Sequence, residues 1–157
     1  MAEVAIVEVG SAEQLEQALA IRVAVFVDEQ GVSRALEIDG HDAAARHLLA
    51  LRHGAPVGTL RVRWLDGGRT AKIERVAVLP AARGSNIGRA LLEAALALAG
   101  SAGADTASLH AQTTVQRFYD KLGFVAYGPE FMEDGILHIA MRRSLPADAA
   151  CDRGVPP

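Results

Sequence analysis

The passage from Lys72 to Gly100 restricts the fold more than any other part of the sequence. A strand pattern over Lys72–Leu79 ends at Pro80, and helical spacing then runs from Ile87 to Leu98 before Gly100 closes it. Amide groups at a helix N-terminus have no partner within the helix, and the helix dipole favours negative charge there. The passage therefore predicts a strand, a loop and a helix that together bind an anion such as a phosphate.

The loop itself supports this prediction. Gly84, Gly88 and the turn-tolerant Asn86 let the backbone approach an anion closely, and Arg83 and Arg89 add mobile positive charge. An ordinary strand-to-helix turn is the alternative interpretation. The loop lacks the Lys-Ser/Thr of a P-loop and the spacing of a dinucleotide fingerprint, which disfavours ATP and NAD.

Strand and helix patterns alternate along the rest of the chain. Other strand patterns cover Ala5–Val9, His47–Leu51, Val57–Trp64, Ala107–Ala111, Phe124–Tyr127 and Ile136–Arg142. Helical spacing follows Ser11, which forms a capping box with Gln14, and recurs over Thr114–Leu122 before Gly123. Residues 28–45 are expected to form a long irregular connection. The order β-α-loop-β-β-β-α-β-α-β-β predicts an α/β (α+β) fold, in which about seven strands form a mixed sheet flanked by helices.

Length and composition limit the domain count and the partners. The 157 residues fit one domain over 1–145 and a frayed tail over 146–157. A net charge of −3, with both signs interspersed, argues against nucleic acid, and the sequence has no membrane-spanning run. The single cysteine, Cys151, excludes an intramolecular disulfide and a cysteine metal site, and no other metal pattern is present. These features favour a cytoplasmic protein.

Two motifs resemble the GCN5-related N-acetyltransferase (GNAT) superfamily. Arg83, Asn86 and Gly88 occupy the three positions of its signature Arg/Gln-x-x-Gly-x-Gly/Ala, with asparagine in place of the usual glycine. Asparagine is the non-glycine residue best suited to a positive φ. Phe118–Phe124 is similar to the late motif Phe-Tyr-x-x-x-Gly-Phe. The resemblance covers about Val4–Leu145 and implies a strongly twisted sheet, splayed between its fourth and fifth strands where pantetheine inserts.

Three further segments are similar to a subgroup of small bacterial acetyltransferases whose acceptor is generally unassigned: Phe26–Val32, Leu109–Gln112 and Phe131–His138. The resemblance implies that acetyl-CoA is the cosubstrate and that its acetyl group passes directly to a primary amine, of a small molecule or a peptide, in a ternary complex. A homodimer would be ordinary for the family. The expected cofactor contacts are Val76, Ala77, Val78, Arg83, Gly84, Ser85, Asn86, Ile87, Gly88, Arg89, Gln112 and Phe118.

Acetyl transfer to an amine requires a base, because an alkylamine is almost entirely protonated near pH 7. Glu74 is the candidate, acting directly or through water: its strand precedes the loop, and an apolar sheet around it would raise its pKa. The alternative is a solvated carboxylate paired with Arg61, Arg63 or Arg75. Tyr119 matches the family's general acid, although it also suits packing under the last helix. Retention of both residues argues against a non-catalytic acyl-CoA-binding module.

The acceptor contacts are expected in an acidic loop and at three histidines. Residues 28–42 carry a formal charge of −4, which predicts attraction of a cationic amine, although solvated acidic surface is an equal alternative. A structural role is the alternative for each histidine, and His110 shares a strand face with Gln112. The candidate acceptor contacts are Glu29, Gln30, Asp39, His47, His110 and His138.

Overall fold

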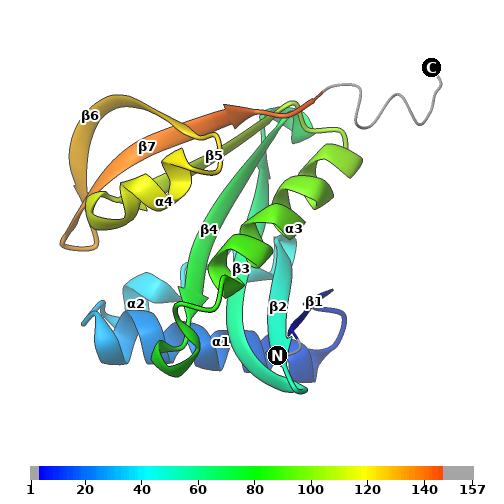
Figure 1. Cartoon of the computed structure of the whole chain (residues 1–157). Coiled ribbons are helices and arrows are strands. Elements are labelled where there is room, and N and C mark those ends of the chain that lie inside the picture. The colour runs from blue at the N-terminus through cyan, green and yellow to red at the C-terminus, as the bar shows by residue number, and fades with distance from the viewer. Residues whose placement is uncertain (1–3, 147–157) are drawn as a thin grey trace. The chain divides into compact units, whose positions relative to one another are not determined.

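A single hydrogen-bonded sheet organises the chain (Figure 1). The structure is a computed structural model that describes residues 4–146, so residues 147–157 of the predicted tail, with Cys151, lie outside the described residues. In the described part, seven strands follow the order β1-β2-β3-β4-β5-β7-β6. Their bounds are β1 Val4–Glu8, β2 Arg46–Arg52, β3 Ala55–Leu65, β4 Thr70–Val78, β5 Thr106–Gln112, β6 Val125–Glu133 and β7 Ile136–Ser144.

Helices alternate with these strands in the predicted order. The helices are α1 Ala12–Arg22, the π-helix η1 Val23–Glu29, α2 Arg34–Glu37, α3 Ile87–Ser101 and α4 Gln116–Asp120. Short 3₁₀ turns are η2 Asp42–Ala44, η3 Asp66–Gly68, η4 Pro80–Ala82 and η5 Thr113–Val115. The predicted α/β fold, with a mixed sheet flanked by helices, is confirmed.

Several predicted boundaries were wrong. The connection over residues 28–45 is not irregular throughout, because it contains α2 and η2. Gly100 lies inside α3, and the left-handed residue that ends this helix is Gly103 at φ +94°. The last helix predicted over Thr114–Leu122 is instead a 3₁₀ turn followed by the short α4. β6 continues to Glu133, because a register shift between Tyr127 and Phe131 accommodates residues 128–130 in the strand.

Contacts divide the described chain into two compact units. The single domain predicted over 1–145 stays a prediction. The first unit comprises residues 4–63 and 74–95. Its helix α1 begins with the predicted capping box: Ser11 Oγ accepts a hydrogen bond from the Gln14 amide at 3.1 Å, and Gln14 Oε1 accepts one from the Gly10 amide at 2.7 Å.

Aliphatic side chains form the core of this first unit. Ala18 and Ile21 of α1 pack with Val25 of η1, Leu49 of β2 and Ala77 of β4, and all five are at most 4% exposed. Burial of such side chains is the main favourable contribution to folding. The packing fixes β4, which carries Glu74, against the first helix.

The second unit comprises residues 64–73 and 96–146. Within it, β5 pairs with β7 in antiparallel fashion over its whole length and with β4 in parallel through Thr70–Lys72 and Thr106–Ser108. β6 pairs with β7, and α4 lies beside β5 (Figure 1). Buried Tyr119, Leu122 and Phe124 anchor α4 and the turn after it. The strand order therefore brings β6 and β5 to opposite sides of β7.

Gly58 of β3 determines how closely α3 approaches the sheet. A Cβ atom at this position would lie 3.1 Å from Leu91 Cδ1, 3.2 Å from the Ala77 carbonyl and 3.3 Å from Ile87 Cγ2. We expect Gly58→Ala to lower the free energy of unfolding by roughly 1–3 kcal/mol, since overpacking forces neighbours to move. Urea unfolding measures this, with Gly10→Ala as control because the nearest atom there is 3.9 Å away. Equal effects of the two substitutions would contradict the predicted contact.

Candidate active site

The loop before α3 has the backbone expected of an anion site. Gly84 and Asn86 adopt left-handed conformations at φ +83° and +63°, and residues 83–86 are exposed. The predicted left-handed conformation of Asn86 is thus confirmed, and its carbonyl accepts the Ala90 amide at 3.0 Å as α3 begins. No atom lies within 4 Å of the position of a Cβ on Gly84. The loop at Gly84 is therefore open to a ligand.

Both arginines of this loop pair with carboxylates. Arg83 donates two hydrogen bonds of 2.7 Å to the Glu29 carboxylate and one of 2.9 Å from Nε to the Val78 carbonyl. Arg89 pairs with Glu93 one turn along α3 at 3.1 Å. Both pairs are exposed, and such pairs are weak enough to exchange partners. Glu29, predicted as an acceptor contact, is therefore placed beside the loop, where it competes with any bound anion for Arg83.

A third arginine lies at this loop, and no local pattern in the sequence predicts it. Arg52, the last residue of β2, places its Nη1 3.5 Å from Ser85 Oγ. Only the pairing of distant strands brings it there, since the two residues are 33 positions apart. Arg52 adds a further positive charge beside the predicted phosphate site.

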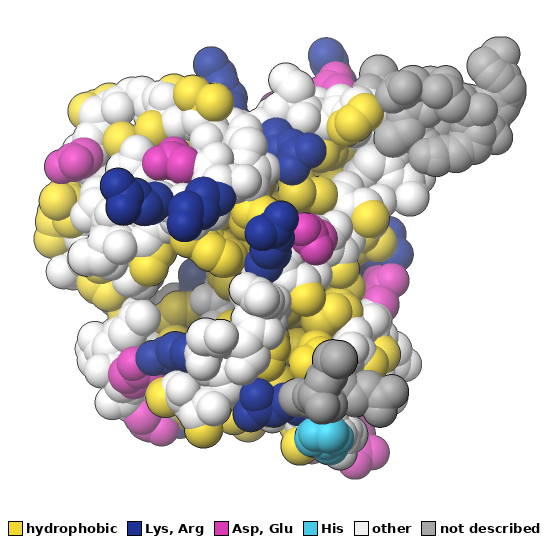
Figure 2. Space-filling model, in the orientation of Figure 1, with side chains coloured by type: hydrophobic (Ala, Val, Ile, Leu, Met, Phe, Trp, Pro, Cys, Tyr) yellow, Lys and Arg dark blue, Asp and Glu magenta, His cyan; other side chains and the backbone are white. Residues whose placement is uncertain are grey.

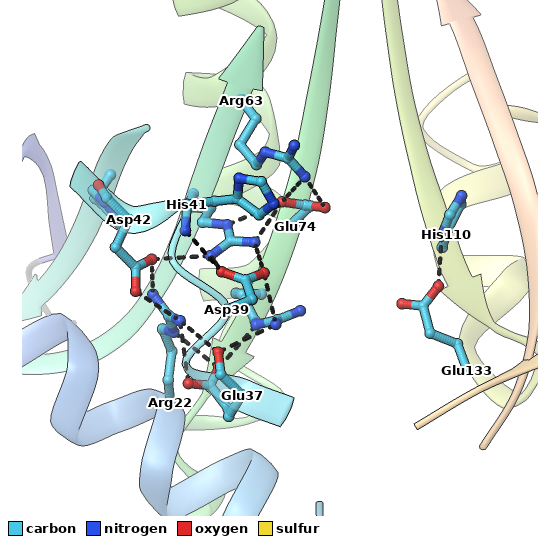
Figure 3. A network of polar contacts seen from close by, with 12 residues as sticks. Arg22, Glu37, Asp39, His41, Asp42, Arg63, Glu74, His110 and Glu133 are labelled. Atoms are coloured by element: carbon cyan, nitrogen blue, oxygen red, sulfur yellow. Dashed lines mark hydrogen bonds and ion pairs between the residues drawn. The ribbon is translucent and has the colours of Figure 1, made fainter. Parts of the chain in front are cut away.

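Glu74 belongs to a dense network of charged side chains (Figure 3). Arg61 Nε donates to Glu74 Oε1 at 2.9 Å, and Arg63 Nη1 donates to Oε2 at 3.2 Å. The expected apolar surroundings of Glu74 are therefore wrong, because two guanidinium groups face its carboxylate. Positive charge at this distance favours the ionised form.

Arg61 joins Glu74 to the acidic loop. It is fully buried, and it donates to Asp39 at 2.9 Å and to Asp42 at 3.0 Å as well as to Glu74. The hydrogen bond from Arg61 holds the pKa of Asp39 well below its usual range. Burial alone would raise the pKa of Asp42, but Arg22 and Arg61 lower it. The loop's carboxylates are thus largely neutralised by arginines.

Arg75 completes the network through an unusual backbone. Its φ is +56° inside β4, and its side chain reaches Glu37 at 2.9 Å and Asp39 at 3.2 Å. Neighbouring residues of a regular strand point to opposite faces. The left-handed residue breaks this alternation, so Glu74 and Arg75 both join one cluster. Four arginines and four carboxylates take part: Arg22, Arg61, Arg63, Arg75, Glu37, Asp39, Asp42 and Glu74.

Two other predicted acceptor contacts in this unit have structural surroundings. His47 is 5% exposed, and its Nε2 donates to the Asp42 carbonyl at 2.9 Å. This hydrogen bond favours the structural interpretation of His47. Gln30 follows the π-helix, where its amide bonds to the Val25 carbonyl at 3.0 Å, and its side chain lies on the surface.

Tyr119 lies in the second unit. Its ring packs edge-on against Phe118 at 5.0 Å and Phe124 at 6.1 Å, and burial raises the pKa of Tyr119 to about 12. No residue that the structure describes hydrogen-bonds to its hydroxyl group. The phenol therefore stays protonated near neutral pH and has a free proton to donate.

His110 and His138 flank Phe131 in the same unit. His110 Nδ1 lies 2.7 Å from Glu133 Oε1, and the ring meets Phe131 edge-on at 4.9 Å (Figure 3). The His138 ring stacks on the same Phe131 ring, with a distance of 6.0 Å between centroids. Its Nδ1 donates a hydrogen bond to the Ile136 carbonyl at 2.7 Å. The sequence singled out both histidines but missed the contact between His110 and Glu133.

The described residues hold no group of three or more His, Cys, Asp or Glu side chains arranged to bind a metal ion. In the same residues, no helix has the length and apolar character needed to cross a bilayer. Lys and Arg are interspersed with Asp and Glu on the face drawn in Figure 2.

A sequence profile of the acetyltransferase (GNAT) domain matches residues 8–145, which includes both the loop before α3 and the segment around Tyr119. The chain belongs to the GNAT family. The N-acetyltransferase YjcF of Bacillus subtilis, itself uncharacterized, is 36% identical over 83% of this chain and 93% of YjcF. The sequence similarity thus covers most of both chains.

Two solved structures extend the comparison. ElaA of Escherichia coli superimposes with a TM-score of 0.78 at 33% identity, over 91% of this chain and 99% of ElaA. An acyl-CoA N-acyltransferase from Pseudomonas aeruginosa superimposes with a TM-score of 0.77 at 35% identity, over 90% of this chain and 99% of that enzyme. Both comparisons place the chain's fold among GNAT proteins.

The charged network makes Glu37 a sensitive position. Glu37 is 2% exposed. Its carboxylate accepts hydrogen bonds from Arg22 and forms an ion pair with Arg75. We expect Glu37→Gln to lower the free energy of unfolding by roughly 3–5 kcal/mol, because it removes a buried counter-charge that Arg22 and Arg75 share. Glu93→Gln, which removes an exposed pair of the same kind, should cost less than about 1 kcal/mol. Urea unfolding of both variants measures the difference, and similar losses would contradict a buried network.

The same network predicts the pH dependence of stability. Because the pKa values of Asp39 and Asp42 are lower in the folded chain, their contribution is complete above about pH 4, the usual value for Asp. It is lost as the pH falls below that value toward the folded pKa values. Unfolding curves from pH 7 to pH 3 should therefore show wild-type stability decreasing below pH 4.

Proposed function

We propose that this chain is an N-acetyltransferase that transfers the acetyl group of acetyl-CoA to a primary amine by direct attack in a ternary complex. The observation that carries the proposal is the exposed loop before α3, in which Gly84 and Asn86 are left-handed. Membership of the GNAT family supports acyl transfer as the reaction class. A cytoplasmic location and a homodimer stay predictions.

The loop fits the pyrophosphate of acetyl-CoA, which would supply the acetyl group as a thioester. The space around Gly84 is open, and Arg52, Arg83 and Arg89 surround the loop with positive charge. Backbone amides bind phosphate well where a helix begins. By family resemblance, the amides of Val76–Val78 in β4 would hold pantetheine and polarise the thioester carbonyl, and Gln112 and Phe118 would contact the cofactor.

Tyr119 suits the role of proton donor to the departing thiolate. Its raised pKa of about 12 keeps the phenol protonated over the working pH range. Its unpartnered hydroxyl supports this role.

Glu74 is less suited to the role of base. Its carboxylate already accepts hydrogen bonds from Arg61 and Arg63, and these favour the unprotonated state. A base in this reaction must accept and hold a proton. The contacts therefore support a structural role for Glu74, which fixes β4 to the acidic loop.

The acceptor is proposed only as a primary amine of a small molecule or peptide. The acidic loop was expected to attract a cation, but Glu37, Asp39 and Asp42 all pair with arginines. Attraction over a distance needs unbalanced charge. The contacts therefore give little support to selection of cationic acceptors by this loop.

Binding of CoA tests the loop. We expect Gly88→Glu to abolish CoA binding in calorimetry, because a bulky negative side chain would occupy the phosphate position. Ala97→Glu is the control, since it adds the same charge to an exposed position of the same helix. Unchanged CoA affinity in a folded Gly88→Glu variant would exclude the loop as the site. Tight CoA binding without thiol release across a panel of amines would instead favour a non-catalytic binding module.

Kinetics tests Tyr119. Loss of a general acid typically slows a reaction by about 10²–10⁴-fold, so we expect Tyr119→Phe to slow thiol release by roughly 100-fold with little change in CoA affinity. Tyr127→Phe is the matched control, because that ring lies on the surface of β6 under Arg142. If Tyr119→Phe released thiol at the wild-type rate while chemistry limits turnover, Tyr119 would be only a packing residue.

A further inference from the structure

A second pair of acid–base groups lies in the unit that contains Tyr119. His110 is exposed on β5, and its Nδ1 lies 2.7 Å from Oε1 of Glu133 on β6 (Figure 3). The two residues are 23 positions apart and are joined through β7, which pairs with both strands. Phe131 meets the His110 ring edge-on at 4.9 Å and limits its rotation. The ring is thus held in one orientation.

The contact determines which nitrogen of His110 is available. A carboxylate only accepts hydrogen bonds, so the proton between the two groups lies on Nδ1 and the lone pair lies on Nε2. No other residue that the structure describes hydrogen-bonds to the His110 ring. A carboxylate behind an imidazole fixes its tautomer and stabilises the imidazolium that forms when Nε2 gains a proton. Nε2 of His110 therefore has the properties of a base.

Glu133 remains negatively charged in this arrangement. The hydrogen bond from His110 lowers the pKa of Glu133, and His138 of β7 and Lys72 of β4 act in the same direction. These three groups are the charged or titratable neighbours that act on Glu133. The carboxylate can thus hold the His110 ring throughout the neutral range.

His110 shares a strand face with a proposed cofactor contact. The parallel ladder joins β5 to β4 through Thr106–Ser108, and His110 lies two residues beyond it. Alternation along the strand puts the His110 and Gln112 side chains on one face, and Gln112 is a proposed cofactor contact. The other candidate base, Glu74, is held by two arginines.

We propose that His110 is the base of the reaction and that Glu133 is the residue that positions it. Nε2 of His110 takes a proton from the ammonium group of the acceptor. The N–H bond breaks, its electron pair stays on the amine nitrogen, and a new N–H bond forms on the imidazole. The neutral amine then attacks the thioester carbonyl, so that a C–N bond forms and the C–S bond breaks. The nitrogen loses a second proton, which balances the one that the thiolate takes, and the imidazolium returns its proton to water. This inference rests on the proposed acetyltransferase function.

The pH dependence of turnover tests the base. Thiol release from acetyl-CoA is measured from pH 5 to pH 9 at saturating levels of two active amines from the panel that differ in basicity. The acidic limb of the pH profile is the range over which turnover falls as the pH decreases. If it reports the protonation of an enzyme group rather than of the amine, it lies at the same pH for both amines. We expect His110→Gln to lower kcat by roughly 100-fold or more and to remove this acidic limb. Glu74→Gln should retain the limb. His53→Asn and Glu130→Gln, which alter exposed residues of the same types, are the controls.

A spectroscopic measurement tests the role of Glu133 independently of activity. Nitrogen-15 NMR of the histidine rings should show the Nδ1–H tautomer of His110 in the wild type. Glu133→Leu should shift His110 toward the Nε2–H tautomer and lower kcat, and Glu133→Asp should restore both in part. A purely structural role of Glu133 would leave the tautomer unchanged.

Several results would overturn the inference. Retention of the acidic limb in His110→Gln, or its loss in Glu74→Gln alone, would assign the base elsewhere. A predominant Nε2–H tautomer in the wild type would also exclude it, whether or not an active amine is found. Failure of the wild type to release thiol with any amine, while CoA binds, would instead refute the proposed acetyltransferase function and the base role with it.

Discussion

Neutralisation of buried Arg61 is the interaction on which the first unit depends. An unpaired charge in a protein interior costs several kcal/mol, and Arg61 is fully buried. Its hydrogen bonds go to Asp39, Asp42 and Glu74, so one guanidinium joins the acidic loop to β4. Arg22 extends the same network to α1 through Glu37. The loop after the first helix therefore has its conformation set by ion pairs rather than by an apolar core.

This network also separates two tasks that a strand glutamate can perform. A carboxylate that anchors guanidinium groups has to stay ionised, whereas a catalytic base has to alternate between two protonation states. Glu74 meets the first requirement through Arg61 and Arg63. His110 meets the second, because one of its nitrogens is committed to Glu133 and the other is free of hydrogen bonds within the described residues. The two units thus differ in the chemistry their charged groups allow.

Local patterns in the sequence predicted the order of elements and the loop before α3, because strand spacing, Pro80 and the left-handed preference of Asn86 act over a few residues. Contacts between distant segments could not be predicted in this way. The acidic loop was counted as negative charge because its arginine partners lie on α1, β3 and β4. Likewise, the contact of His110 with Glu133 depends on β7 lying between β5 and β6. The charge of a segment can be counted from the sequence, but the residues that pair with it can be identified only when the order of the strands is known.

The left-handed backbone of Arg75 restricts which residue types can occupy position 75. Glycine or asparagine would adopt φ +56° at less cost, but neither supplies a guanidinium to Glu37 and Asp39. Lysine would supply charge without the forked geometry that reaches both carboxylates. Few residues therefore satisfy the backbone and the ion pairs together. In a collection of random variants of this chain, position 75 should accept fewer substitutions than its partial exposure suggests, and changes there should survive mainly when Glu37 or Asp39 changes as well.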